Sequence, residues 1–335
     1  MLRLAFGAEK DTIRKMKTPS RFPCFRLLAA ASLAFCFPVP LCAEEKPAAQ
    51  AKGKKLTAED NEQLNKATAA SSEAASLFGK GQYAEAEKQG RTALTIRERV
   101  LGAEHPETLA SRMGVAVALD DQGKHAEAEK EHRAVLAIRE RVLGAEHLHT
   151  LGSRGNLAAA LQAQGKNAEA EKEYRAVLPI MERVLGAEHP DTLMCRNNLA
   201  AALQALGKNA EAEKEFRAVL ASMERMLGAE HPNTLGSRGN LAVVLYAQGK
   251  NAEAEKEHRA VLAIKESVLG AEHPDVFKSC YNVALCLEAQ QKLAEALAFM
   301  QRAETGYTKV LGPEHPNSKA AKRIRERVEA AMRKP

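Results

Sequence analysis

The stretch VLGAEHPDTL, residues 184–193, decides how this chain is interpreted because it recurs. A single copy would place Glu188 beside His189 and suggest an acid-base pair or half of a metal site. With small changes the stretch stands at six places, each 42 residues after the last, at Leu101, Leu143, Leu185, Leu227, Leu269 and Leu311. A catalytic pair is needed once, whereas a structural joint is needed at every repeat. The recurrence therefore favours a repeat protein with a recurring joint.

Composition favours an all-helical protein with a thin core. Of 335 residues, 45% are hydrophobic, enough to exclude wholesale disorder, but only 4% are aromatic and none is Trp. Ala, Leu and Val supply most of the apolar content, which suits closely spaced helices. We expect Cys195, Cys280 and Cys286 to be small core residues, since the last two lie six apart on one expected helix and too far apart for an easy disulfide.

The charge is concentrated at the ends. The chain has a net charge of +6, but residues 1–43 hold seven bases and two acids, so the remainder is almost neutral at +1. Such a body does not favour nucleic acid as a partner. Residues 319–335 hold seven bases and two acids. These bases suit a solvated final helix, and binding to an acidic partner or lipid surface is the alternative.

The N-terminus is typical of a secretory signal peptide. Lys17, Arg21 and Arg26 precede an apolar run at 27–37, and Leu41-Cys42-Ala43 is a plausible cleavage site. We expect export to the periplasm or outside a bacterial cell, with Met16 as an alternative start to Met1 and an uncleaved anchor as the alternative to cleavage. Residues 44–56 carry few large apolar side chains and are expected to form a flexible linker.

Each 42-residue unit is expected to hold two helices. In the unit that begins at Asp191, apolar residues recur at helical spacing in both halves, and Gly207 lies between the halves. Glycine holds this turn position in the first five units, and Gln291 replaces it in the sixth, where we expect a looser turn. Pro179 falls inside a second helix, which it is expected to bend or loosen.

The joint itself is explained by helix ends. Gly186 suits a left-handed cap after the second helix, Pro190 suits the first turn of the next helix, and Asp191 complements the positive end of that helix. Glu188 and His189 are then linker residues. Equivalent loops of stacked units lie on the order of 10 Å or more apart per helix crossed, too far for shared metal ligation. We expect no metal and no cofactor.

At the level of motifs, the units resemble the tetratricopeptide repeat. The resemblance rests on Leu199-Ala200, Gly207, Ala212, Phe216 and Val219, and the LG-x-EHP-x-T-L linker with RNNLA and GK-x-x-EAE is similar to the 42-residue kinesin-light-chain type. The heptad coiled coil of that family is missing, and an export signal would separate the protein from a cytosolic motor, so we do not expect a kinesin subunit.

The resemblance implies an all-α, right-handed α-solenoid of about six helix pairs over residues 57–316, with a basic capping helix over 317–335. First helices are expected to begin near Leu56, Glu107, His149, Asp191, Asn233 and Asp275. In the first unit Glu73 replaces the leucine or valine of later units, as suits an end unit whose outer face meets water.

The resemblance also implies that first helices line a concave groove that binds a peptide or helical segment. Small side chains there would let a guest backbone approach, and amides would hydrogen-bond to it. The expected groove residues are Asn156, Gln162, Asn197, Asn198, Gln204, Asn240, Tyr246, Lys278, Tyr281 and Asn282.

Two columns of the groove have structural alternatives. Asn156, Asn198, Asn240 and Asn282 occupy positions that in this family often hold a bound peptide backbone, with capping or bridging between helices as the alternative. Arg112, Arg154, Arg196 and Arg238 suggest either a grip on guest carboxylates or, as we favour, salt bridges to glutamates of neighbouring helices.

The two candidate catalytic motifs of the sequence each lack a feature that the motif requires. Residues 151–155, LGSRG, lack the first glycine of a nucleophile elbow, and no strand precedes GKGQYA at 79–84. We therefore expect a non-catalytic scaffold or adaptor that binds a protein or peptide. A self-assembling structural solenoid and a regulatory subunit of an envelope enzyme are the alternatives.

Overall fold

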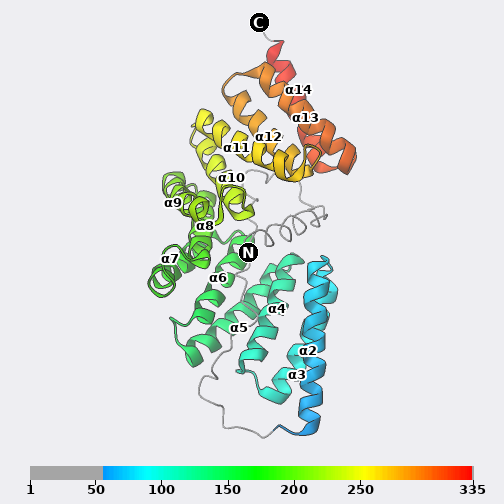
Figure 1. The fold of residues 1–335 in the computed structure, drawn as a ribbon, viewed down its shortest axis with the longest axis vertical. Coiled ribbons are helices and arrows are strands. Elements are labelled where there is room, and N and C mark those ends of the chain that lie inside the picture. The colour runs from blue at the N-terminus through cyan, green and yellow to red at the C-terminus, as the bar shows by residue number, and fades with distance from the viewer. Residues whose placement is uncertain (1–55, 334–335) are drawn as a thin grey trace, which may run out of the picture. The chain divides into compact units, whose positions relative to one another are not determined.

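The computed structural model describes residues 56–333, in which every regular element is an α-helix (Figure 1). The first helices of successive pairs are α2 (Ala58–Gly79), α4 (Pro106–Asp121), α6 (Leu148–Ala163), α8 (Pro190–Ala205), α10 (Pro232–Ala247) and α12 (Pro274–Ala289). The second helices are α3 (Tyr83–Leu101), α5 (His125–Leu143), α7 (Asn167–Val184), α9 (Asn209–Leu227), α11 (Asn251–Leu269) and α13 (Leu293–Leu311), and α14 (Pro316–Met332) follows. The all-α solenoid is confirmed for these residues.

The expected signal peptide at 1–43 and all but the last residue of the 44–56 linker lie outside the described residues. The helix starts agree with the expected ones to within two residues. We number the pairs repeats 1 to 6, from α2/α3 to α12/α13.

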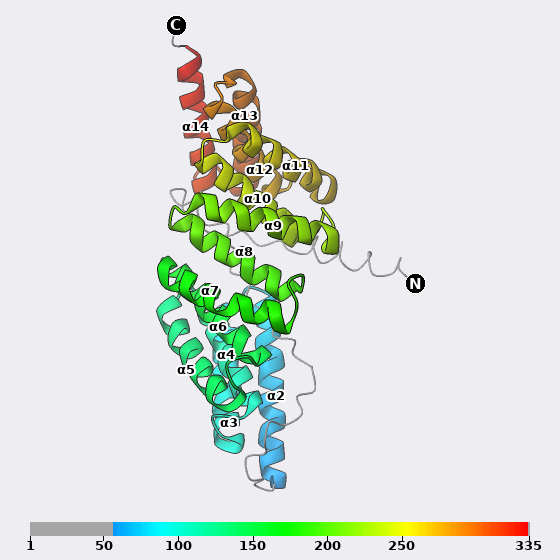
Figure 2. The same cartoon turned by 90° about the vertical axis from the view of Figure 1, so that its left-hand side faces the viewer.

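Two compact units make up the described chain, residues 56–202 and residues 203–333, and the division falls inside α8. Within the first unit successive helices from α2 to α7 pack against each other, and within the second unit those from α9 to α14 do so. In the first unit α2 lies along α3, as both views show (Figures 1 and 2). In the second unit α13 packs against both α12 and α14. Consecutive pairing leaves each repeat dependent on the repeats next to it.

Both units have a buried apolar core. At 56–202 the fully buried side chains include Tyr174, Leu157 and Met181, and Leu109, Met113 and Val135 form one of the clusters. In residues 203–333 one cluster spans α11 to α14 and includes the aromatic rings of Phe277 and Tyr307. Cys195, Cys280 and Cys286 are buried as expected, and burial raises their thiol pKa values to about 12, 11 and 12.

The turn at Gln291 corrects a prediction. Gln291 adopts a left-handed φ of 62°, close to the 77° of Gly249 at the equivalent position one repeat earlier. Gln291 N–H donates to Glu288 O at 2.9 Å and Lys292 N–H to Leu287 O at 2.9 Å, as in the glycine turn. The expected looser turn is therefore wrong. The helix ends on both sides fix the turn, and Gln291 accepts an unfavourable backbone conformation.

The effect of Pro179 is small at the level of secondary structure. Helix α7 continues through Pro179 and ends at Val184, one position before the equivalent ends of α5 and α9. The expected bend stays a prediction.

Candidate protein-binding surface

A histidine caps each first helix from α4 onward and the final helix α14. In α10 the ring Nδ1 of His231 accepts a hydrogen bond from Asn233 N–H at 3.2 Å, and Pro232 follows as the first helical residue. The same contact is made by His105, His147, His189, His273 and His315 at 3.1–3.2 Å. A ring nitrogen thus satisfies an amide that the helix cannot. This role was missed from the sequence, although a histidine before an N-terminal proline in five of six joints is its signal.

Ion pairs of the linker glutamates connect a joint to the second helix of the next repeat. Arg141 pairs with Glu104 at 2.5 Å, and Lys309 pairs with Glu272 at 2.6 Å, in each case 37 residues apart. No group of three potential metal-ligating side chains occurs within residues 56–333. The Glu-His pairs that first suggested chemistry thus have structural roles: the histidines cap helices, and Glu104, Glu146, Glu272 and Glu314 form ion pairs.

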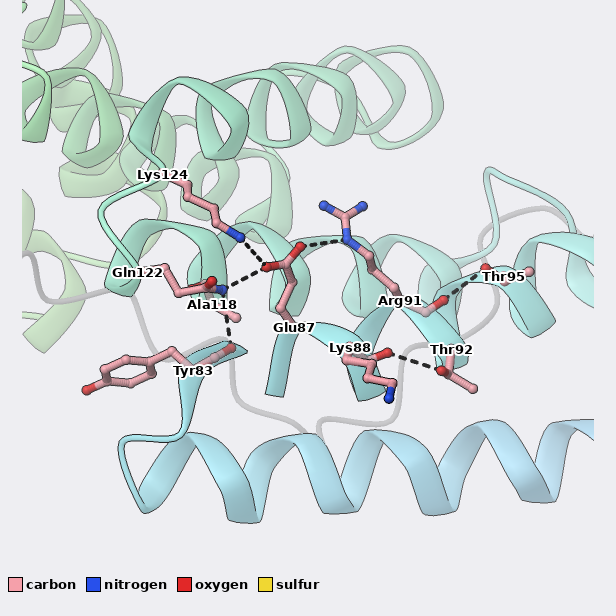
Figure 3. Close-up of polar contacts among 9 residues, drawn as sticks. All are labelled: Tyr83, Glu87, Lys88, Arg91, Thr92, Thr95, Ala118, Gln122 and Lys124. Atoms are coloured by element: carbon pink, nitrogen blue, oxygen red, sulfur yellow. Dashed lines mark hydrogen bonds and ion pairs between the residues drawn. The ribbon is translucent and has the colours of Figure 1, made fainter. Parts of the chain in front are cut away.

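A second stitch joins the second helix of one repeat to the first helix of the next. In Figure 3, the Glu87 carboxylate accepts hydrogen bonds from Arg91 (2.8 Å), Gln122 (2.8 Å) and Lys124 (3.0 Å). Burial alone would raise the pKa of Glu87, but these three donors lower it to about 2. Gln122 also donates to the Tyr83 carbonyl at 3.3 Å. The motif GK-x-x-EAE is thereby explained as an inter-repeat clamp, and it recurs at Glu129, Glu213 and Glu255.

The arginine column forms salt bridges, as favoured. Arg112 pairs with Glu98 at 2.5 Å and lies 3.7 Å from Glu131. Arg154, Arg196 and Arg238 pair in the same way with Glu140, Glu182 and Glu224. Each guanidinium joins a first helix to the second helix before it, so its charge is already neutralised. The column is architectural.

The expected groove residues in the first unit are largely covered. Asn156 on α6 is 2% exposed, and its amide donates to the Met113 sulfur at 3.4 Å. Asn198 on α8 is 3% exposed, and its Nδ2 has no hydrogen-bond partner among residues 56–333. Asn197 is half-buried, and its Oδ1 also has no partner within the described chain. Gln162, at the end of α6, is half-buried.

The expected residues in the second unit are more accessible. Asn240 and Tyr246 on α10 and Lys278 and Asn282 on α12 are half-buried, whereas Tyr281 is buried. Gln204, at the end of α8, is half-buried too. We call Gly236, Gly239, Asn240, Val243, Tyr246, Lys278, Tyr281, Asn282 and Leu285 the first-helix surface.

One neighbour of this surface was not foreseen. Arg327 of α14 donates two hydrogen bonds to the Glu288 carboxylate at the end of α12, at 2.7 and 2.6 Å. The charge of Arg327 also acts on the hydroxyls of Tyr246 and Tyr281. Burial is the main reason why the pKa of Tyr246 is raised. The sequence offered no signal for this contact, since Glu288 on α12 and Arg327 on α14 lie 39 residues apart along the chain.

Glycines on the first helices are not required by packing. A Cβ added to Gly236 or Gly239 of α10, or to Gly152 of α6, would meet no neighbouring atom of the described chain within 4 Å. None of the three has the positive φ that favours glycine. Glycine in a helix costs about 1 kcal/mol relative to alanine. These glycines therefore weaken their helices, and no packing contact within residues 56–333 requires them.

Comparison with known proteins agrees with the geometry. The family model described as tetratricopeptide repeat matches residues 65–141, 147–225, 196–267 and 233–309. A solved kinesin-light-chain-like protein of Podosopora anserina with nearly identical TPR-like repeats is 32% identical, with 61% of this chain and 97% of that chain covered and a TM-score of 0.53.

Two more distant structures share the fold. BtubC (BKLC) from P. vanneervenii is 20% identical, with 76% of this chain and 93% of that chain covered and a TM-score of 0.55. The apo form of RapI is 14% identical, with coverages of 80% and 99% and a TM-score of 0.55. No similar sequence is found among curated proteins. No described helix is long and apolar enough to cross a membrane. The chain belongs to the tetratricopeptide repeat family, with repeats like those of kinesin light chain.

Proposed function

We propose that this protein is a non-catalytic scaffold that binds a segment of another protein on its first-helix surface. The open glycines of α10 carry the proposal. Gly236 and Gly239 lower helix stability, no side chain of the described residues fills the space beside them, and half-buried Asn240 follows directly. Glycine without an internal reason suits the close approach of a guest backbone.

The amides suit an unpaired backbone. An asparagine side chain both donates and accepts, so Asn240 and Asn282 can each satisfy a peptide N–H or C=O of the guest. A guest helix already pairs its own backbone groups and would leave these amides unused. An extended segment therefore fits the surface better than a helical one. Val243 and Leu285, both half-buried on the same two helices, offer apolar contact to its side chains.

The expected cellular setting is part of the proposal. A leader such as residues 1–43 would deliver the scaffold to the bacterial envelope or beyond, so the guest would be an exported protein. Neither a catalytic nor a metal role is needed for this function.

The test is selection of peptides from a displayed random library on the purified chain, followed by affinity measurement with variants. Loss of one amide contact costs about 1 kcal/mol, so Asn240→Ala with Asn282→Ala should weaken the selected peptide by more than about tenfold. Asn209→Ala with Asn251→Ala, on second helices, is the matched control and should bind as the wild type does.

A second pair of variants separates binding from folding. Gly236→Ala with Gly239→Ala should raise the unfolding temperature, because alanine favours helix, while blocking the guest. Gly79→Ala makes the same change at the end of α2, where a Cβ also has open space. Equal peptide affinity for both glycine variants and the wild type would overturn the proposed surface.

A further inference from the structure

The two end helices carry opposite charges. Helix α14 holds five bases and two acids, a net of +3, whereas α2 holds four acids and one base, a net of −3. By the same count each of the helices α3 to α13 has a net charge between −2 and +1. The strongest charges of the described helices therefore lie at the first and the last.

The acids of α2 lie partly on a face that later repeats cover. Glu73 is exposed, and the residue 42 positions later, Val115, is fully buried in a cluster with Leu94 of the repeat before it. Ser76 is likewise exposed where its counterpart Ala118 is 2% exposed. In residues 56–333 no repeat precedes α2, so this face lacks the partner that its counterparts have.

The bases of α14 lie on the opposite kind of face. Lys322 and Arg323 are exposed, whereas their counterparts on α12, Cys280 and Tyr281, are buried in the cluster shared with α13. The described chain has no second helix after α14 to cover them. Each end also exposes one large apolar side chain, Leu56 at 40% and Met332 at 46%.

Charged end faces keep repeat proteins soluble, but either sign serves that purpose at either end. Opposite signs on uncovered faces make the two ends complementary to each other. We propose that copies of this chain associate head to tail, with α14 of one copy against α2 of the next. The contact joins two different surfaces, so it does not close on itself and gives short chains that grow with concentration.

This association is electrostatic, so we expect added salt to weaken it. Each exposed ion pair contributes little, and at about 0.3 M salt the attraction between exposed charges is screened beyond several ångströms. The association does not depend on the proposed function, because α2 and α14 lie outside the first-helix surface. Peptide binding and self-association can thus fail separately.

The test is sedimentation velocity of the full chain from about 10 to about 200 μM, at about 20 mM and about 300 mM salt. We expect the weight-average mass to rise with concentration in low salt and association to weaken by about tenfold or more in high salt. The first triple variant changes the net charge of α14 to −3 and carries Lys319→Glu, Lys322→Glu and Arg323→Glu. The second changes the net charge of α2 to +3 and carries Glu59→Lys, Glu62→Lys and Glu73→Lys.

Each triple variant should be monomeric alone, and an equimolar mixture should associate again because opposite ends meet once more. Circular dichroism melting confirms that both variants are folded. A monomer under all conditions, a dimer that neither grows with concentration nor responds to salt, or association that survives either triple substitution would overturn the proposal.

Discussion

Ser153 on α6 and Ser237 on α10 occupy equivalent positions two repeats apart, yet their surroundings differ. The Ser153 hydroxyl accepts a hydrogen bond from buried Arg139 of the preceding helix at 2.8 Å. The residue equivalent to Arg139 is Met223, which has no donor, and the Ser237 hydroxyl is buried without a hydrogen-bond partner in the described chain. One repeat after Ser153, Met181 stands at the position of Arg139 and Cys195 at that of the serine.

This difference shows that the energetic effect of a residue at one repeat position depends on the residue at the position that contacts it. Serine with arginine is satisfied, methionine with cysteine is apolar on both sides, and methionine with serine leaves a hydroxyl unpaired. A buried unpaired polar group costs about 1–3 kcal/mol. Equivalent positions with different partners therefore make matched pairs for experiment.

The largest effect is expected at Gly306, where isoleucine stands one repeat earlier as Ile264. A Cβ at Gly306 would lie 2.3 Å from the Phe277 ring, while the earlier repeat has the smaller Leu235 in place of Phe277. Gly306→Ala should destabilise the chain by about 3 kcal/mol through overpacking, measured by urea unfolding.

The control for Gly306 is a compensating change. Phe277→Leu supplies the smaller partner that the earlier repeat has as Leu235, so the double variant should recover most of the loss. If Gly306→Ala alone were neutral or stabilising, the partner rule would not hold in the C-terminal core.

Acid stability is expected to change at His258, where repeat 4 has Phe216. Burial and, to a smaller extent, Lys265 lower the pKa of His258 to about 4, below its unfolded value near 6.5. Its contribution is therefore fully present above pH 6.5 and is lost as the pH falls toward 4, by about 2 kcal/mol at about pH 4.5. His258→Met, which copies Met300 of repeat 6, should flatten unfolding free energy between about pH 7 and about pH 4.5.

Glutamate titration does not obscure this window. Hydrogen bonds from Lys250, Gln248 and Arg217 hold the pKa of Glu213 at about 2 despite its burial. Protonation of the clamp glutamates therefore weakens their ion pairs only at lower pH. The same slope in the variant and the wild type would assign the effect to other groups.

The serine pair should respond with opposite signs. Ser153→Ala removes an acceptor from buried Arg139 and should cost about 1–2 kcal/mol, whereas Ser237→Ala removes an unpaired hydroxyl and should stabilise by up to about 1 kcal/mol. Both are read from thermal unfolding under identical conditions. Equal losses at the two sites would refute the comparison.

The smallest effect is expected at the turn. Gln291→Gly should stabilise by about 1 kcal/mol, because a side chain in the left-handed region is unfavourable and glycine holds this position in the other five turns. Gly249→Gln, the reverse change, should destabilise by a similar amount. A destabilising Gln291→Gly would show that the glutamine side chain makes a contribution of its own.

Much of the fold follows from the sequence because the period fixes it. The helix starts were predicted to within two residues from three features: the 42-residue recurrence, the turn glycines, and the proline that follows every joint histidine but one. The turn at Gln291 was mispredicted because local preference was weighed without the helices that hold the turn. Tertiary packing outweighed the cost of one unfavourable φ.

The candidate site was less predictable. Asn156 and Asn240 hold the same repeat position, but Asn156 contacts Met113 in the repeat before it and is buried, whereas Asn240 is half-buried. Accessibility depends on neighbours that differ between repeats, and a single repeat pattern does not contain them. The contact from Arg327 was hidden for the same reason.

The most direct test of the central claim is photo-cross-linking of a selected peptide. A benzophenone amino acid is placed at Val243, on the first-helix surface, or at exposed Ala263 on the second helix α11. The account predicts a covalent adduct from position 243 that an excess of unlabelled peptide suppresses, and none from position 263. A specific adduct from position 263 alone would contradict it and move the binding site to the second helices.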